Sequence, residues 1–280
     1  MEPSPQSYLI IGAGAFGAST ALHLIRAHPT AQITLLDRTA YPSPYAAAHD
    51  LNKIIRADYD DKFYLQLALE AQRYWREDPL FAPYYHETGM LLCEDFGMCV
   101  KAEGHYKALG VDVPAEWITP DEIRTRFGGV LKGMDLSGVE RGFWNPTSGW
   151  GVADKALENV VRCAIDLGVT YVTARVRKLT FDAEQGTCVG VQTEHGREYG
   201  ADRVVVCAGP WTAKLFADSA PQNEKLQVNG RMVAAAAVMA TVRIPAERAE
   251  EFKHAPVLFN DKIHGKAPSL SPLPQSRLRA

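Results

Sequence analysis

The residue types best suited to bind a charged cofactor stand near the start of the chain. Glycines recur as G-x-G-x-x-G at Gly12, Gly14 and Gly17, directly after an apolar run that is typical of a buried strand. The first glycine permits a tight turn, the second lets the backbone approach a pyrophosphate, and the third lets a helix pack against the strand. Asp37 ends a second apolar run, where a carboxylate can accept hydrogen bonds from ribose hydroxyls. The pattern predicts a dinucleotide-binding β-α-β unit.

The glycine motif leaves the cofactor open between NAD and FAD. An ordinary β-α-β unit that binds no nucleotide is the alternative interpretation, because glycine-rich turns are common. Asp37 would repel a 2′-phosphate, which disfavours NADP, although the cation Arg38 beside it partly offsets that repulsion.

Basic residues gather just after this unit, at His49, Lys53 and Arg56. Arg56 could bind the carboxylate of a substrate through its planar guanidinium fork, with the other two cations close to the reactive end of the cofactor. A solvated basic turn is the alternative. The five cysteines form no C-x-x-C pair and are expected to be reduced thiols, and we predict no metal site.

Apolar residues at helical spacing predict the helices that surround these residues. Beyond the helix of the β-α-β unit, helices are predicted at 61–77, 120–127, 154–167 and 247–252. In the first of them, Phe63, Leu67, Ala71 and Tyr74 form a stripe that is expected to pack in the core. The second follows Thr119, which begins a capping box.

Short β-branched and apolar runs predict the remaining strands, at 89–93, 170–172, 176–181, 188–194, 203–208 and 230–244. The three between 170 and 194 are expected to form an antiparallel meander. The run at 203–208 is expected to return beside the first nucleotide strand. The alanines in 230–244 leave a helix as an alternative to the strand. Residues 142–151 are predicted to form a loop, which either lies over a flat ligand or is a surface turn with a core aromatic residue.

Composition bounds the class of protein and its partners. The chain has 280 residues, of which 46% are hydrophobic and 22% charged, enough for one large or two modest domains. A net charge of −3 implies neither a nucleic acid nor an anionic membrane as partner. We recognise no signal peptide and no apolar run long enough to span a bilayer, and we expect an intracellular protein.

Four segments together resemble the fungal FAD-dependent amine oxidases, the group of monomeric sarcosine, pipecolate, saccharopine and fructosyl amino acid oxidases. The segments are the opening glycine motif, Asp50-Leu-Asn-Lys-Ile-Ile-Arg-Ala-Asp-Tyr59, the Gly149-Trp-Gly turn, and Val204-Val-Val-Cys-Ala-Gly-Pro-Trp211. The resemblance implies an α/β fold, with a Rossmann-like FAD-binding domain of the glutathione-reductase type and a mixed-sheet substrate domain. We place the first domain at 1–80 and 145–225, the second at 81–144 and 226–260, and a disordered tail at 261–280.

The resemblance also implies a reaction. A secondary amino acid such as sarcosine, pipecolate or saccharopine would lose a hydride equivalent from its C–N bond to FAD, and O2 would then be reduced to H2O2. Arg56, Lys53 and His49 are the expected catalytic residues, with Arg56 as the partner of the substrate carboxylate. The expected cofactor-binding residues are Gly12, Ala13, Gly14, Ala15, Phe16, Gly17, Asp37, Arg38, Asn52, Lys53, Val176, Ala208, Gly209 and Trp211. The chain is expected to be a monomer.

The resemblance ends at about Asn260, whereas the family continues with a lysine, a cysteine and a glycine-rich segment near the flavin. The expected form is therefore C-terminally truncated. A catalytically inactive flavin-binding fragment is one alternative, and an NAD-dependent dehydrogenase is another. The last residues do not match the peroxisomal tripeptide of some relatives, so both a cytoplasmic and a peroxisomal location stay open.

Overall fold

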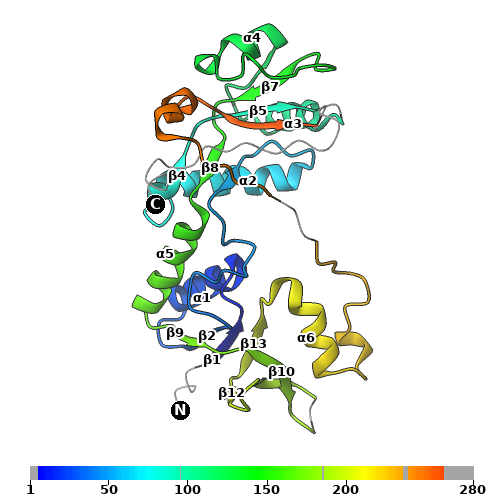
Figure 1. The fold of residues 1–280 in the computed structure, drawn as a ribbon. Coiled ribbons are helices and arrows are strands. Elements are labelled where there is room, and N and C mark those ends of the chain that lie inside the picture. Colours follow the sequence, from blue (N-terminus) through cyan, green and yellow to red (C-terminus); the bar gives the residue numbers. More distant parts are fainter. Residues whose placement is uncertain (1–5, 95, 185, 236–238, 262–280) are drawn as a thin grey trace. The chain divides into compact units, whose positions relative to one another are not determined.

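The structure is a computed structural model that describes residues 6–94, 96–184, 186–235 and 239–261 (Figure 1). The chain folds as two compact units. Unit 1 comprises residues 1–50 and 153–237, and unit 2 comprises residues 51–152 and 238–280. Apart from Asp261, the tail that the sequence predicts to be disordered lies outside the described residues.

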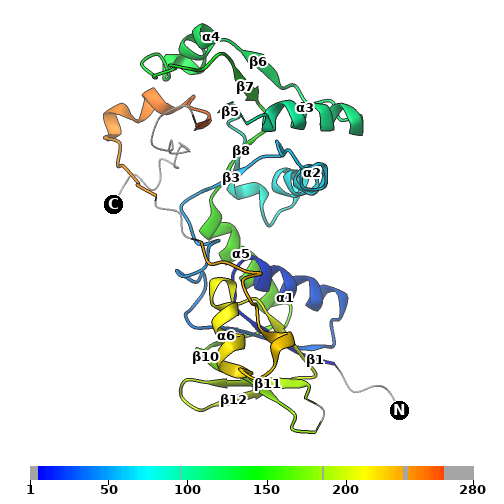
Figure 2. The ribbon, with the colours of Figure 1, turned by 90° about the vertical axis from the view of Figure 1, so that its right-hand side faces the viewer.

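Unit 1 is built on a parallel sheet with the strand order β13-β1-β2-β9. Its strands are β1 (Ser7–Ile11), β2 (Gln32–Asp37), β9 (Thr170–Thr173) and β13 (Arg203–Val206). Two helices, α1 (Ala15–Ala27) and α5 (Ala153–Asp166), pack side by side (Figures 1 and 2). Apolar side chains of both helices are buried, so they cover the sheet.

The rest of unit 1 is an antiparallel meander of β10 (Val176–Phe181), β11 (Cys188–Thr193) and β12 (Glu198–Gly200). It packs on the sheet through a core that includes Leu36 and Leu179, and helix α6 (Thr212–Ser219) lies against β10. Short 3-10 turns follow at η3 (Gly209–Trp211) and η4 (Glu224–Leu226).

Unit 1 confirms the predicted return of the chain, because β13 pairs in parallel with β1 from Tyr8↔Arg203 to Ile11↔Val206. The placement of residues 170–172 in the meander is wrong. β9 instead pairs in parallel with β2, starting at Thr34↔Thr170. The reason is the helix before it: α5 carries the chain back along the sheet, and Gly168, at φ +114°, turns it into the sheet edge.

Unit 2 contains a mixed sheet and a small antiparallel one. The mixed sheet, in the order β14-β5-β7-β6, consists of β5 (Met90–Cys93), β6 (Glu116–Ile118), β7 (Gly142–Asn145) and β14 (Val257–Asn260). The small sheet, in the order β3-β8-β4, consists of β3 (Lys53–Ile55), β4 (Tyr85–His86) and β8 (Gly149–Gly151). Only the β14–β5 pair of the mixed sheet is parallel.

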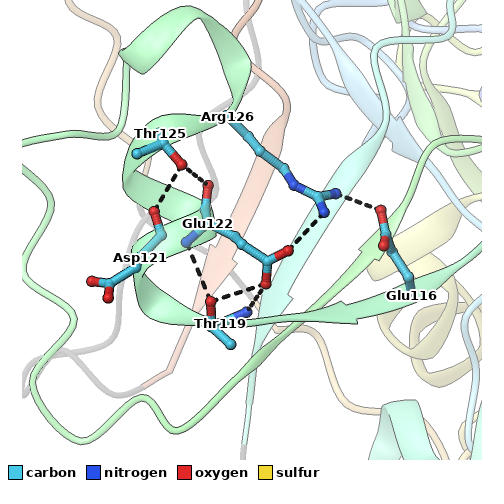
Figure 3. A network of polar contacts seen from close by, with 6 residues as sticks. All are labelled: Glu116, Thr119, Asp121, Glu122, Thr125 and Arg126. Atoms are coloured by element: carbon cyan, nitrogen blue, oxygen red, sulfur yellow. Dashed lines mark hydrogen bonds and ion pairs between the residues drawn. The ribbon is translucent and has the colours of Figure 1, made fainter.

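The helices of unit 2 are α2 (Lys62–Glu77), α3 (Met98–Leu109) and α4 (Pro120–Thr125), with 3-10 turns η1 (Ala82–Tyr84), η2 (Phe127–Gly129) and η5 (Ala246–Phe252). Helix α4 begins with the capping box that the sequence predicts (Figure 3). The Thr119 hydroxyl accepts from the Glu122 N–H, and the Glu122 carboxylate accepts from the Thr119 N–H at 2.8 Å. Arg126 then joins Glu122 to Glu116 of β6, which ties the helix to the sheet.

Residues 142–151 form β7 and β8 rather than the predicted loop. Their pairing explains the difference, since β7 lies between β5 and β6, and β8 lies between β3 and β4. Trp150 is buried and stacks on His86 with ring centres 4.2 Å apart. Of the two interpretations of this segment, the core aromatic residue is the one that the structure supports.

Two further predictions are wrong, one about residues 230–244 and one about helix α2. The described residues of 230–244 form no strand, and Val233 and Val242 are largely exposed, so their β-branched side chains pack on no sheet. The stripe of α2 is exposed as well, with Phe63 at 63% and Leu67 at 46%. The helix buries the opposite face instead, where Leu65 joins the core with Ala57, Ala102 and Tyr106.

The compact units divide at 50/51 and 152/153, and the domain bounds near 80 and 145 stay a prediction from the sequence. Strand pairing accounts for the division into units. β3 pairs with β8 through Lys53↔Gly151 to Ile55↔Gly149, which brings residues 51–80 and 145–152 into unit 2. None of the described helices is long and apolar enough to cross a membrane.

Candidate functional site

The glycine turn of unit 1 is held by close backbone contacts. Gly12 has φ +100°, which favours glycine, and a Cβ on it would lie 2.3 Å from the carbonyl oxygen of Cys207. A Cβ on Gly17 would lie only 1.7 Å from the carbonyl oxygen of Gly12. The Gly12 N–H donates to the Leu36 carbonyl at 2.7 Å. The ends of β1 and β2 and the start of α1 therefore meet at positions where no side chain fits.

Helix α1 opens onto this turn with a free N-terminus. Gly14 is the N-cap residue and provides no side-chain cap, and no acidic residue lies in the first turn of this helix, all of which the structure describes. A Cβ on Gly14 would meet only the Cβ of Ala46, at 3.6 Å. The next residues, Ala15 and Phe16, are exposed. Unsatisfied N–H groups and the positive end of the helix dipole favour an anionic phosphate here.

Asp37 fastens the turn to the end of β2. Its carboxylate accepts from the Ala13 N–H at 2.9 Å and from the Thr39 N–H at 3.3 Å. Each carboxylate oxygen has two lone pairs, so Asp37 can accept a ribose hydroxyl in addition. The structure thus shows a second role for Asp37, as a support of the turn.

Arg38 and Trp211, which are far apart in sequence, lie together in unit 1. The guanidinium carbon of Arg38 lies 3.6 Å from the ring centre of Trp211 and 4.7 Å from that of Tyr45. Gly209 begins the turn η3 with φ +54°. Val176 and Ala208 are partly buried beside the same hydrophobic core.

The expected catalytic residues are divided between the units. His49 is exposed and belongs to unit 1, whereas Lys53 and Arg56 belong to unit 2. Lys53 is exposed and opens β3, while Asn52 and Arg56 are half-buried at either side of that strand. Only Lys53 and Arg56 among the three are placed together within one unit.

Arg56 is held on one side of its guanidinium. Nη1 donates to the carbonyl oxygen of Asp58 and contacts the Met98 sulfur at 3.7 Å, while the guanidinium carbon lies 4.1 Å from the ring centre of Tyr59. Within the described residues, every hydrogen bond found for this group uses Nη1. Nε and Nη2 therefore present N–H groups in the geometry that binds a carboxylate with two hydrogen bonds.

Asp58 is a buried acid that sequence reasoning missed. It is 0% exposed, and its carboxylate accepts from Tyr106, Asn145 and Ser148. Burial raises the pKa of Asp58, and these hydrogen bonds together with the charge of Arg56 counteract the rise. Its partners lie 48 to 90 residues away, so no spacing in the sequence reveals the cluster.

Residues 7–266 match the DAO family, which is described as FAD dependent oxidoreductase. The chain belongs to this family. The match decides between the two nucleotides that the glycine motif leaves open, in favour of FAD. It confirms the predicted membership of an FAD-dependent oxidoreductase family and the predicted α/β fold.

Curated relatives and solved structures agree with this assignment. L-saccharopine oxidase of Schizosaccharomyces pombe is 28% identical over 91% of this chain and 60% of its own length. Peroxisomal sarcosine oxidase of Homo sapiens is 28% identical over 74% of this chain and 51% of its own length. The structure of fructosyl peptide oxidase from E. terrenum superposes with a TM-score of 0.74 at 28% identity, over 93% of this chain and 59% of that one.

The chain spans about three-fifths of the length of the first of these relatives. The part that matches the family includes the glycine turn, where Gly12, Gly14 and Gly17 leave the space that the pyrophosphate of FAD needs. Among the described residues, no group of three or more His, Cys, Asp or Glu side chains could hold a metal ion.

Proposed function

We propose that this chain uses FAD to oxidise the C–N bond of a secondary amino acid, such as sarcosine, pipecolate or saccharopine, with O2 giving H2O2. The observation that carries the substrate class is Arg56, whose Nε and Nη2 groups face no protein acceptor in the described residues. An arginine fork in this state suits the carboxylate that all these substrates share.

In this proposal the nucleotide half of FAD lies on unit 1. Its pyrophosphate binds at Gly12, Ala13, Gly14, Ala15, Phe16 and Gly17, its ribose at Asp37, and the remaining contacts from this unit come from Arg38, Val176, Ala208, Gly209 and Trp211. Asn52 and Lys53, which belong to unit 2, are the other two proposed cofactor-binding residues. FAD, when bound, supplies the hydride acceptor. Free N–H groups at the start of α1 support the pyrophosphate position, and the exposed ring of Trp211 supports a contact with a flat group.

The residues of unit 2 bind and orient the substrate in this proposal. Arg56 holds the carboxylate, and Lys53 adds a second positive charge that favours an anionic substrate. His49 is the third proposed residue, on the evidence of its place in the same sequence segment alone. We propose a monomer that is located in the cytoplasm or, like the peroxisomal sarcosine oxidase to which the chain is similar, in the peroxisome.

The test is a peroxide assay on the purified chain, supplied with FAD and with a panel of amines that do or do not carry a carboxylate. Arg56→Lys keeps the charge but loses the fork, so KM for the carboxylate substrates should rise about 10- to 100-fold. KM for amines without a carboxylate should not change. Arg73→Lys, at an exposed arginine of α2, is the control. An Arg56→Lys enzyme with the KM of the wild type would remove Arg56 from the carboxylate site.

A further inference from the structure

Asp58 is a buried carboxylate for which the proposed reaction has no direct use. Its side chain is 0% exposed and lies among donors from three elements of unit 2. Tyr106 of α3 donates to Oδ1 at 3.0 Å, Asn145 of β7 donates to Oδ1 at 2.8 Å, and Ser148, just before β8, donates to Oδ2 at 3.2 Å. A buried carboxylate with three donors is fixed in position, because any shift breaks hydrogen bonds that water cannot replace.

The backbone of the same residue holds Arg56. The carbonyl oxygen of Asp58 accepts from Arg56 Nη1, and Met98 and the Tyr59 ring contact the guanidinium from two further directions. The side chain of Asp58 thus anchors a peptide unit whose oxygen restrains the arginine. Ala57, between the two, is 1% exposed, so this short segment is packed on the core as well.

We propose that Asp58 is a positioning residue, which anchors the 56–59 segment so that Nε and Nη2 of Arg56 are presented together to a carboxylate ligand. The inference rests on the proposed function only for the statement that this carboxylate belongs to the substrate. The positioning role itself is inferred from two adjacent features, the buried Asp58 cluster and the restraint of Arg56 on one side of its guanidinium.

Lost positioning and simple electrostatics predict opposite changes in the affinity of Arg56 for an anion. Removal of the negative charge of Asp58 would by itself strengthen the attraction of Arg56 for an anion. A weaker affinity of a folded Asp58→Ala variant is therefore the result that lost positioning predicts. Asp58→Asn offers a rescue, because an asparagine oxygen in the place of Oδ1 can accept from Tyr106 and Asn145 while its NH2 group donates to Ser148.

The experiment follows the Nε–H resonance of Arg56 in the NMR spectrum of the full ¹⁵N-labelled chain during titration with sodium acetate. Sodium chloride at the same ionic strength is the reference, and Arg56→Lys assigns the resonance by its loss. The wild type should show a saturable shift. Asp58→Ala should weaken acetate binding at least about tenfold, the loss of one well-placed charged hydrogen bond. Asp58→Asn should stay within about threefold of the wild type.

Asp60→Ala is the matched control, since Asp60 is an exposed acid two residues along the same segment and should leave the affinity unchanged. If Asp58→Ala does not fold, the double variant Tyr106→Phe/Ser148→Ala decides, because it frees the intact carboxylate from two of its three donors. Weaker acetate binding in that variant supports the proposal. Wild-type affinity there or in Asp58→Ala, or a wild type without a saturable shift, overturns it.

The acetate titration needs neither FAD nor turnover, so it separates this inference from the proposed oxidase function. A chain that forms no peroxide but shows the expected acetate affinities would contradict the function and retain the positioning role of Asp58. A chain that oxidises amines, but whose Asp58→Ala variant binds acetate like the wild type, would retain the proposed function and contradict the positioning role of Asp58.

Discussion

The glycine turn of unit 1 and the Arg56 segment of unit 2 are rigid for different reasons. In the turn, two backbone segments are in close contact: Gly17 packs against the carbonyl of Gly12, five residues earlier in the sequence. Around Arg56, side chains meet side chains, and the partners of Asp58 come from as far as Ser148, 90 residues away. The turn has no room for a Cβ at Gly12 or Gly17, whereas the Arg56 segment should tolerate a change that keeps its hydrogen bonds.

Gly17→Ala tests the backbone side of this comparison and should have the largest effect. Its Cβ would lie 1.7 Å from the Gly12 oxygen, and Gly12 is itself tied to Leu36, so neither segment can give way cheaply. We expect the free energy of unfolding to fall by about 4 kcal/mol or more, or folding to fail, in denaturant titrations.

Gly14→Ala is the matched control within the same motif. Its Cβ makes only an ordinary contact with Ala46, so we expect a loss within about 1 kcal/mol, the cost of a poorer N-cap residue. If Gly17→Ala were as stable as Gly14→Ala, the backbone account of the turn would be wrong.

Asp58→Ala tests the side-chain region and should cost about 3 kcal/mol of unfolding free energy. It leaves the buried donors of Tyr106, Asn145 and Ser148 without their acceptor, and each such group costs about 1–3 kcal/mol unless it finds another partner. Asp58→Asn should recover most of this loss in the same denaturant titration. An Asp58→Ala variant with wild-type stability would mean that the cluster rearranges freely.

The two regions also differ in how far the sequence predicts them. The glycine turn follows from a local pattern, since residue type and spacing alone decide which backbone fits. The return of β13 beside β1 is predicted although the two strands are far apart in sequence, because a second strand–glycine–helix turn follows β13. The capping box at Thr119 is also a local pattern, whereas the fold class follows from the resemblance to a family. Such patterns are readable because the interacting atoms belong to neighbouring residues.

Apart from the return of β13, pairing between distant segments could not be predicted in this way. The helical spacing of Phe63 and Leu67 marks an apolar stripe, yet the opposite face with Leu65 is the one that packs. Residues 142–151 carry loop-forming glycines but pair as strands, because partners from elsewhere in the chain flank them. Asp58 belongs to this class as well, since only the fold brings its donors together.

Thr119→Ala extends the comparison to a local, exposed motif and should cost about 1 kcal/mol, the usual value of an N-cap side chain (Figure 3). Thr125→Ala is the control, because its hydroxyl bonds only to helix carbonyls at Asp121 and Glu122. Thermal melts of both variants should show the larger decrease for Thr119→Ala. Equal decreases would show that the box adds nothing beyond helix propensity.

The smallest effect concerns His86, which stacks on Trp150 in the small sheet of unit 2. Burial lowers the pKa of His86 from its usual 6.5. The folded state therefore binds this proton less well than the unfolded state, and stability is lost as the pH falls below about 6.5. His86→Phe keeps an aromatic ring and removes the titration, so its melting temperature should fall less than that of the wild type between pH 7.5 and about 5.5. If the melting temperatures of His86→Phe and the wild type fell equally with pH, a lowered pKa of His86 would be contradicted.

The central claim is that the glycine turn of unit 1 holds FAD, and a visible absorption spectrum tests it most directly. The purified chain, supplied with FAD and desalted, should show flavin bands, and denaturation should release the flavin. Gly14→Ala, whose fold we expect to be intact, should retain much less, because its Cβ stands where the backbone approaches the pyrophosphate. A folded wild-type chain that stays colourless after FAD is added would contradict the claim.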